Sequence, residues 1–375
     1  MSYALPDGGW DDLPEWNPLS VPLDRTQLSR IERAEPVLLP EDAARLRTLP
    51  SSTTSWDAWR ELGERVFFDL PLRAEPALAL ALADPIQREA LGIEADVDGA
   101  LPGVVVFRSV EGRAEVGITC ALCHTAREGD AIIAGRGRRT LDFGRIRLAA
   151  LERRGPVEPR TTERYSSWGP GRADVLEHLS EVPIAIPDLW GMRRLRYFTQ
   201  GGTLTHDSPL TLAIRQETQF IQANHLATRP PRSLVFALVI YLYSLTPPAH
   251  ESDASPEVRA TGALVFAREC GRCHGDAVHS GDLVSIAEIG THPELATGRA
   301  RGTGRYRPSP LIDVRNAAPY FHHGVVPSLQ VLLSRERFGA DYRGVHDTGP
   351  IEGHAYGLDL TSDERDALIA HLETL

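Results

Sequence analysis

The four cysteines of this sequence fall in two short patterns of the same spacing, each followed at once by a histidine. The patterns are Cys120-Ala-Leu-Cys123-His124 and Cys270-Gly-Arg-Cys273-His274. Two thiols a little under one helical turn apart can each add to a vinyl group of one haem, and the next histidine can ligate its iron. The sequence therefore predicts two covalently bound haem c groups. Their thioether and iron ligands would be Cys120, Cys123, His124, Cys270, Cys273 and His274.

Two other chemistries also use paired cysteines. A four-cysteine zinc site is an alternative, but the pairs are far apart in the sequence and the histidines would have no role. A redox-active dithiol is a second alternative, although no thioredoxin-like βαβ pattern surrounds either pair. Histidine makes up 13 of the 375 residues, so two chance followers would arise about once in a thousand sequences. Haem attachment is the interpretation that accounts for both histidines.

Length and composition limit the classes of protein to consider. The chain has 375 residues, which at about 100–200 residues per domain suggests two domains. Its net charge is −11, so electrostatics do not favour binding to nucleic acid or to an anionic membrane. The longest nearly apolar run, residues 233–245, has about 13 residues, well below the roughly 20 that span a bilayer. We expect neither a nucleic-acid partner nor a membrane span.

The amino terminus shows no export signal, because residues 1–16 lack a basic segment followed by an apolar one. Covalent attachment of haem takes place outside the cytoplasm in bacteria. We therefore expect that an export signal has been removed from this numbering. The protein is then expected to be periplasmic or otherwise extracytoplasmic.

The pattern around the first motif predicts a mainly α domain over residues 56–246. Residues 1–55 are rich in proline, tryptophan and acidic residues without periodicity, so we expect an extended arm. Apolar spacing after Ser55 predicts a helix, and alternating valines around a glycine predict a β-hairpin over residues 102–118. The other expected elements are helices over 209–226 and 232–245, and a solvated basic loop with a short helix over 136–160.

A second domain is expected over residues 258–375, after a proline- and serine-rich linker at residues 247–257. Ser255 can cap a helix that leads into the second motif. Thr361 and Glu364 form the pattern of a capping box before an amphipathic terminal helix. The predicted fold is mainly α, with two cytochrome c-like haem domains and a small β-hairpin in the first.

Four stretches resemble the bacterial di-haem cytochrome c peroxidase superfamily, which includes the MauG-type enzymes. They are residues 120–124, residues 270–274, Ile186-Pro-Asp-Leu-Trp190 and Asn316-Ala-Ala-Pro-Tyr-Phe-His-His-Gly-Val-Val-Pro-Ser-Leu329. The last is similar to the family's PYFHDGSVPTL stretch, and the resemblance covers most of the chain from about residue 100 onward. Three stretches are more similar to the branch that contains the di-haem rubber oxygenases: Gly169-Pro-Gly-Arg172, Ile289-Gly-Thr291 and Gly353-His-Ala-Tyr-Gly357.

The resemblance implies an oxidoreductase whose amino-terminal haem reduces hydrogen peroxide. Its carboxy-terminal haem would stay six-coordinate and relay electrons from a small redox protein or another donor. Cleavage of the O–O bond then needs an acid/base group near an open iron and a polar pocket for the separating charge. The alternatives are a plain di-haem electron carrier, and a MauG-like or oxygenase-like oxidant of another substrate that uses O2 or peroxide. The resemblance also leaves calcium open as a further cofactor.

Methionine marks the main departure from the family, since only Met1 and Met192 occur. Neither follows the second motif, so the family's usual methionine ligand of the second haem has no counterpart. The second haem must then take a histidine, a tyrosine or no ligand there. We predict His354, because flanking glycines let the backbone approach closely, with a surface position or a contact to a propionate as the alternatives. The downstream candidates are His279, His292, His322, His323, His346, His354 and His371. Of these, His322 matches a family histidine with a structural role, and His371 is expected to face solvent.

The first haem lacks the histidine that closes it in many members of the family. No histidine lies between His124 and His178, so the iron is either open or closed by a distant residue. The distant candidates are Met192, His178 and His206.

The remaining site residues follow from the family's pattern. Glu217 lies in the region of its acid/base group, with a solvated helix carboxylate as the alternative. The family's tryptophan between the haems is absent from residues 197–202, so Trp190 or Trp168 could serve as electron relay, with core packing as the alternative. The predicted catalytic residues are Glu217 and Trp190, and the predicted partners of haem propionates are Arg307 and Arg315.

Overall fold

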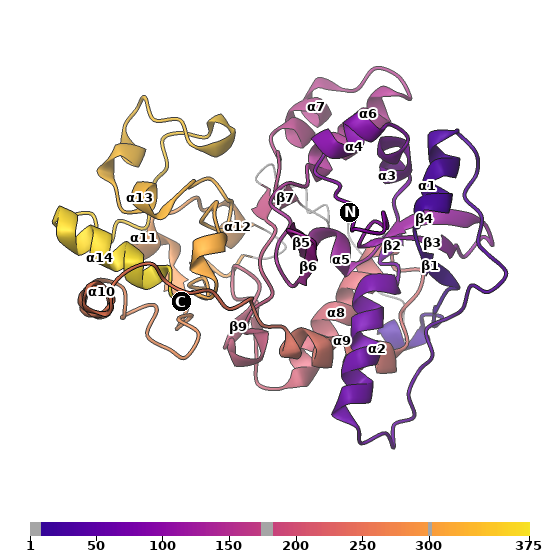
Figure 1. Cartoon of the computed structure of the whole chain (residues 1–375), viewed down its shortest axis with the longest axis horizontal. Coiled ribbons are helices and arrows are strands. Elements are labelled where there is room, and N and C mark those ends of the chain that lie inside the picture. The colour runs from indigo at the N-terminus through magenta and orange to yellow at the C-terminus, as the bar shows by residue number, and fades with distance from the viewer. Residues whose placement is uncertain (1–8, 174–182, 299–301) are drawn as a thin grey trace. The chain divides into compact units, whose positions relative to one another are not determined.

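The computed structural model describes residues 9–173, 183–298 and 302–375. These residues are rich in helix and contain small antiparallel sheets, as a mainly α chain should (Figure 1).

The contacts within the chain divide it into two units. Unit 1 comprises residues 1–171 and 208–245, and unit 2 comprises residues 172–207 and 246–375. The sequence predicts a boundary after residue 246 but does not separate residues 172–207, because no change in composition marks that segment. Whether each unit holds one haem stays a prediction.

Two long helices form the centre of unit 1. α2 (Trp56–Asp69) begins after Ser55, whose side chain caps it as the sequence predicts. It packs against α9 (Arg232–Ser244). A Cβ atom on Gly63 would lie 2.0 Å from the carbonyl oxygen of Ala237, so only glycine lets the two helices approach this closely.

The predicted hairpin is confirmed and belongs to a larger sheet. β3 (Val104–Arg108) and β4 (Ala114–Ile118) pair antiparallel, with β1 (Ser20–Pro22) and β2 (Arg73–Ala74) at the two edges. β1 lies in the predicted amino-terminal arm, which also contains helix α1 (Arg25–Glu32). Since β4 runs directly into the first cysteine motif, this sheet determines where the motif lies.

The other elements of unit 1 surround this core. α8 (Pro209–Ala223) packs against α9, and the two confirm the helices predicted there. The remaining bounds are η1 (Gly9–Asp12, a 3-10 helix), α3 (Pro76–Leu82), α4 (Pro85–Ala90), α5 (Cys120–Cys123), β5 (Thr125–Glu128), β6 (Ala131–Ala134), α6 (Phe143–Glu152) and α7 (Pro159–Ser166).

Two helices cross at the centre of unit 2. α10 (Pro256–Glu269) begins after the predicted cap Ser255 and leads into the second motif. α14 (Ser362–Leu372) begins with the predicted capping box of Thr361 and Glu364. A Cβ atom on Gly262 would lie 1.9 Å from a backbone carbonyl oxygen of α14, so the crossing requires glycine.

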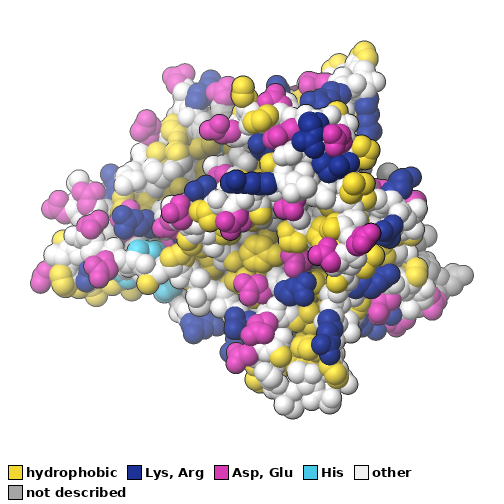
Figure 2. All heavy atoms as spheres, turned by 45° about the vertical axis from the view of Figure 1, so that its right-hand side comes forward, with side chains coloured by type: hydrophobic (Ala, Val, Ile, Leu, Met, Phe, Trp, Pro, Cys, Tyr) yellow, Lys and Arg dark blue, Asp and Glu magenta, His cyan; other side chains and the backbone are white. Residues whose placement is uncertain are grey.

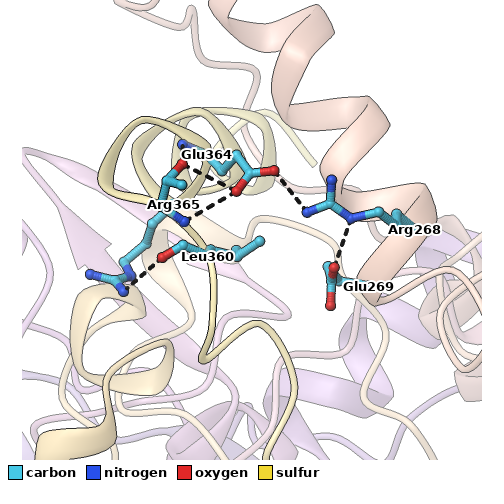
Figure 3. Close-up of polar contacts among 6 residues, drawn as sticks. Arg268, Glu269, Leu360, Glu364 and Arg365 are labelled. Carbon is cyan, nitrogen blue, oxygen red and sulfur yellow. Dashed lines mark hydrogen bonds and ion pairs between the residues drawn. The ribbon is translucent and has the colours of Figure 1, made fainter.

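Charged and aromatic side chains also join α10 to α14. Arg268 of α10 pairs with Glu364 of α14 at 2.9 Å and with its neighbour Glu269 at 2.7 Å (Figure 3). The ring centroid of His371 lies 5.5 Å from that of Phe266. His371 is therefore partly buried at the crossing, and the expectation that it faces solvent is wrong.

Residues 172–207 join unit 2 through backbone pairing. β7 (Arg172–Ala173) pairs with β8 (Ile184–Ala185), and the amide of Ala185 donates to the carbonyl of His322 at 3.0 Å. Such contacts between distant parts of the sequence leave no local pattern. The remaining bounds in unit 2 are η2 (Met192–Arg194), β9 (Tyr197–Phe198), β10 (Leu204–Thr205), β11 (Val284–Ser285), α11 (Ile286–Ile289), α12 (Glu294–Thr297), β12 (Arg305–Tyr306), η3 (Val314–Asn316), α13 (Leu329–Leu332), η4 (Arg335–Phe338) and η5 (Val345–Asp347).

The surface carries charges of both signs. On the face drawn in Figure 2, basic and acidic side chains are intermingled, and hydrophobic side chains lie between them. Within the described parts of the chain, no helix has both the length and the apolar character that crossing a membrane requires.

Candidate cofactor-attachment sites

The first cysteine motif forms a single helical turn, α5, directly after β4. The side chain of Thr119 caps this turn, and the amide of His124 donates to the carbonyl of Cys120 at 3.1 Å. Residues three apart in such a turn lie on the same face. Gly103 (φ +86°) packs against the turn so closely that a Cβ atom there would lie 1.8 Å from a backbone nitrogen. The two thiols are thus held side by side on a fixed backbone.

A hairpin of β5 and β6 follows the first motif and returns to it. The amide of Gly135 donates to the carbonyl of His124, and the amide of Arg138 donates to the carbonyl of Cys123, both at 2.8 Å. Because the hairpin occupies these backbone acceptors, it fixes the motif from its carboxy-terminal side.

Arg138 is buried beside this motif, with 2% of its surface exposed. Its guanidinium donates to the carbonyl and hydroxyl oxygens of Thr125 at 3.1 and 2.8 Å, and to the carbonyl of Pro102 at 3.5 Å. Burial lowers its pKa. The expectation that residues 136–160 form a solvated loop is therefore wrong at this position.

The environment of the thiols does not favour redox-dithiol chemistry. Burial raises the pKa of Cys120 to about 12, that of Cys123 to about 11 and that of Cys270 to about 11. Cysteines that exchange disulfides have lowered pKa values. A shared zinc site is not favoured either, because within the described ranges no three or more His, Cys, Asp or Glu side chains are grouped to hold a metal ion.

The second motif follows α10 and has the same backbone bond as the first. The amide of His274 donates to the carbonyl of Cys270 at 2.9 Å. Nδ1 of His274 lies 2.5 Å from the carbonyl oxygen of His279, and because a carbonyl only accepts, Nδ1 is the donor. Its proton is then on Nδ1, which leaves the lone pair of Nε2 for a metal.

His354 lies close to the second motif. Its pKa is lowered to about 4, first by burial and then by the repulsion that a protonated His274 would exert. Its amide donates to the carbonyl of Ile289 at 2.7 Å. A Cβ atom on Gly353 (φ +81°) would lie 2.3 Å from the amide nitrogen of Thr291, so the close backbone approach that we expected is made here. Ligation by His354 stays a prediction.

Arg337 holds the segment that carries His354. Its side chain has no exposed surface. It donates hydrogen bonds of 2.8–3.1 Å to the backbone carbonyls of Leu332, Ile351, Gly353 and His354. The guanidinium carbon also lies 4.1 Å from the ring centroid of Phe338. Sequence reasoning missed Arg337, because its partners are backbone atoms of a loop.

Three more histidines gather in unit 2. The rings of His322 and His323 stack with centroids 4.4 Å apart, and the ring of His292 lies 6.3 Å from that of His323. The hydroxyl of Tyr306 donates to the carbonyl of His292 at 2.6 Å and lies 3.3 Å from Nε2 of His322. Burial lowers the pKa of His322, and lowers that of His323 to about 3. At neutral pH His322 and His323 are therefore uncharged and buried, whereas His292 is exposed.

We expect this cluster to make the free energy of unfolding depend on pH. The folded-state pKa of His323, about 3, lies below the ordinary value of 6.5. Between these values the unfolded chain binds a proton that the folded chain does not. The free energy of unfolding should therefore fall by about 1.4 kcal/mol per pH unit for one such group as pH is lowered. The contribution of neutral His323 to the free energy of unfolding is fully present above pH 6.5 and is lost by about pH 3.

Chemical denaturation of the wild type and of His323→Phe between pH 4 and pH 7 checks this prediction. The variant should lose about one proton of the pH dependence, roughly 1.4 kcal/mol per pH unit. The control is Phe321→Leu, which disturbs a ring beside His323 without removing a proton-binding group. It should lower stability equally at every pH. An unaltered slope in His323→Phe would contradict the prediction.

The two predicted catalytic residues lie in different units. Glu217 on α8 is buried and accepts hydrogen bonds from Nε of Arg232 at 3.1 and 3.4 Å. The alternative of a solvated carboxylate is therefore wrong, while an acid/base role stays a prediction. Trp190 in unit 2 is 2% exposed, and its Nε1 has no hydrogen-bond partner among the residues that the structure describes. Trp168 is fully buried in unit 1.

The two predicted propionate partners differ in their surroundings. Arg307 is largely buried, which lowers its pKa to about 10, and it donates to the carbonyl of Thr199 and the hydroxyl of Ser280, both at 3.2 Å. Arg315 is exposed, with its guanidinium 3.9 Å from the carboxylate of Asp253. Of the two, Arg307 has the environment that a buried carboxylate would require.

The distant candidates for closing the first haem do not belong to unit 1. Met192, in η2, and His206 both lie in unit 2. Nδ1 of His206 is 2.6 Å from the carbonyl oxygen of Leu195. Because a carbonyl only accepts, Nδ1 is the donor in this hydrogen bond. His178 lies outside the described residues.

The residues present fit two attached haem groups. Each motif offers two neighbouring thiols and a histidine on a fixed backbone. Buried nitrogen atoms of Arg138, Trp190 and His354 have no hydrogen-bond partner in the described part of the chain. A group that carries carboxylates could accept hydrogen bonds from Arg138 and Trp190, and the imidazole of His354 could ligate iron. Nothing in the side chains described indicates where calcium would bind.

Comparisons with known proteins assign no family to the chain. No protein-family model and no curated protein matches it. One solved structure to which it is similar is described as a MauG-like protein associated with microbial copper homeostasis. The two share 15% sequence identity and a TM-score of 0.34, over 90% of this chain and 95% of the other. An overlap of that quality does not identify a function.

Proposed function

We propose that the protein is an extracytoplasmic di-haem c-type cytochrome that reduces hydrogen peroxide at the amino-terminal haem. Electrons from a donor protein would reach that haem through the carboxy-terminal haem. Each haem, when bound, supplies redox-active iron. The chain's own contribution is to hold the two groups through its cysteines and to orient His124 and His274. The hydrogen bond from His274 to the carbonyl of His279 fixes that imidazole and makes it a stronger ligand.

The observation that carries this proposal is that the two units differ in the histidine and methionine side chains they offer as further iron ligands. In unit 2, His354 is half-buried near His274, and its buried Nδ1 has no hydrogen-bond partner among the described residues, so it would be able to hold iron together with His274. In the described residues of unit 1, the only histidine besides His124 is His225, which is exposed, and there is no methionine. A haem with an open sixth position can bind peroxide, whereas one with two strong ligands is suited to electron transfer.

Glu217 is the proposed acid/base group. Reduction of one peroxide to two waters takes up two electrons and two protons, so a group that moves protons is needed. The partner of Glu217, Arg232, is exposed and also bound to Asp11 at 2.5 Å. Because the guanidinium of Arg232 is exposed and shared between two carboxylates, Glu217 can exchange this partner during turnover.

The test is the absorption spectrum of the protein reduced by one electron, before and after one equivalent of hydrogen peroxide. We expect one high-spin and one low-spin haem, with a peroxide-dependent change confined to the high-spin one. His354→Gln should convert the low-spin haem to high spin.

The control variant is His225→Gln, which removes the exposed histidine of unit 1 and should alter neither haem. Two low-spin haems that do not respond to peroxide would overturn the enzyme proposal and favour an electron carrier. A response to peroxide without turnover of a donor would favour oxidation of another substrate.

A further inference from the structure

Arg138 is a buried cation that pairs with no carboxylate in the part of the chain that the structure describes. The carboxylate of Glu94 acts on its charge without forming an ion pair, and burial, the larger effect, lowers its pKa. Its Nε and one terminal nitrogen donate to Thr125 and Pro102, which are neutral groups. The other terminal nitrogen is buried with no partner in the described ranges.

The buried carboxylate in this neighbourhood is already engaged. Glu75 is 5% exposed and binds Arg73 at 2.8 Å and Arg147 at 3.1 Å. Both Glu75 and Arg138 lie near the thiol of Cys123, since each shifts its pKa. A buried charge that lacks a partner costs several kcal/mol. An arginine held this rigidly, with one nitrogen free, is suited to bind an anion that the polypeptide does not supply.

The position of Arg138 indicates which anion this is. Its own amide is bonded to the carbonyl of Cys123 at 2.8 Å, so the side chain begins at the cysteine motif itself. A haem attached at that motif carries two propionate carboxylates. We propose that Arg138 binds a propionate of the haem attached to Cys120 and Cys123. This inference rests on the proposed function, and it assigns the anion-binding residue of the first site.

The consequence is electrostatic. A fixed positive charge beside the propionate offsets its negative charge, and so favours the reduced iron over the more positive oxidised iron. It also keeps the carboxylate ionised at low pH, because a neighbouring cation lowers the pKa of an acid.

The experiment compares the holoprotein with Arg138→Gln and Arg138→Lys. The first haem of Arg138→Gln is titrated potentiometrically. At a fixed applied potential its ratio of reduced to oxidised haem should be about tenfold lower than in the wild type, which corresponds to a reduction potential about 59 mV lower. Its potential should also become pH-dependent near neutrality as the propionate gains a proton. Arg138→Lys retains the charge and should restore most of the wild-type potential.

The matched control is Arg127→Gln, on strand β5 directly after the first motif. Arg127 is exposed and pairs with Asp130 at 3.4 Å. This variant should leave the potential and its pH dependence as in the wild type. If Arg138→Gln folds and carries two haems but keeps both properties, the inference is overturned.

A measurement on the wild type covers the case in which Arg138→Gln does not fold. Infrared spectra of protein grown with haem labelled with 13C in its propionates report their ionisation as pH is lowered. One propionate of the first haem should remain ionised well below the range of an exposed carboxylic acid. Ordinary titration of all propionates would overturn the inference, whereas absence of covalent haem in the mass spectrum would overturn the proposed function itself.

Discussion

Cys120→Ser combined with Cys123→Ser is expected to give a protein that carries one covalent haem and reduces no peroxide. The remaining haem, in unit 2, should keep its low-spin spectrum, because His274 and His354 lie in that unit. Serine hydroxyls cannot form the thioether bonds that thiols form with the vinyl groups. Intact mass under denaturing conditions, together with the reduced spectrum, measures the outcome.

The reciprocal variant, Cys270→Ser with Cys273→Ser, is the matched control. It should also carry one haem, but with a high-spin spectrum, and it should react with peroxide once without sustained turnover. Two covalent haems in either variant would contradict the attachment sites. Identical spectra from the two single-haem proteins would contradict the proposal that the haem of unit 1 is high-spin and that of unit 2 is low-spin.

Arg337→Met is the substitution in unit 2 with the largest expected effect. It leaves the carbonyls of the loop that carries His354 without their donors. Hydrogen bonds to a charged group contribute about 1.5–3 kcal/mol each, and losses within one network are not additive. We expect the free energy of unfolding to fall by about 3–5 kcal/mol. We also expect the low-spin haem to become partly high-spin as His354 loses its fixed position.

Arg335→Met provides the comparison, since it lies on the same short helix as Arg337. Arg335 is exposed and pairs with Asp359 at 2.5 Å, so its loss should change stability by less than about 1 kcal/mol. Its spectrum should match the wild type. Denaturation and the spin state are measured on the same samples. Equal effects of the two substitutions would show that Arg337 does not position His354.

Local signals in the sequence predicted the main helices and the first hairpin well. Ser55, Ser255 and Thr361 each cap the helix that they precede, and Glu364 completes its capping box. These predictions succeed because a cap depends on residues only three positions away. The glycine before His354 likewise marked a close backbone approach.

The features that were missed depend on residues far apart in the chain. Helix α1 forms within a stretch whose composition indicated an extended arm. The segment 172–207 joins unit 2 through pairing with residues 322 and 323, which no local pattern shows.

The buried arginines could not be recognised from residue type. The sequence contains no lysine, so all 40 basic residues are arginine. Nothing local then separates Arg138 and Arg337, which are buried, from Arg127 and Arg335, which are exposed. Their burial depends on which distant backbone segments pack around them, and this is decided only in the folded chain.

The order of the segments along the chain determines which of the two units acquires all of its residues first during synthesis. Every residue of unit 1 has been synthesised once Leu245 is made, so the contacts within that unit do not require residues 246–375. Residues 172–207 are made earlier, but their partners in 246–375 come last. Until those residues are made, this segment lacks its partners in unit 2, although β9 and β10 within it can already pair. A chain cut after residue 245 would retain the first cysteine motif and all of unit 1, so the first attachment reaction can precede the second.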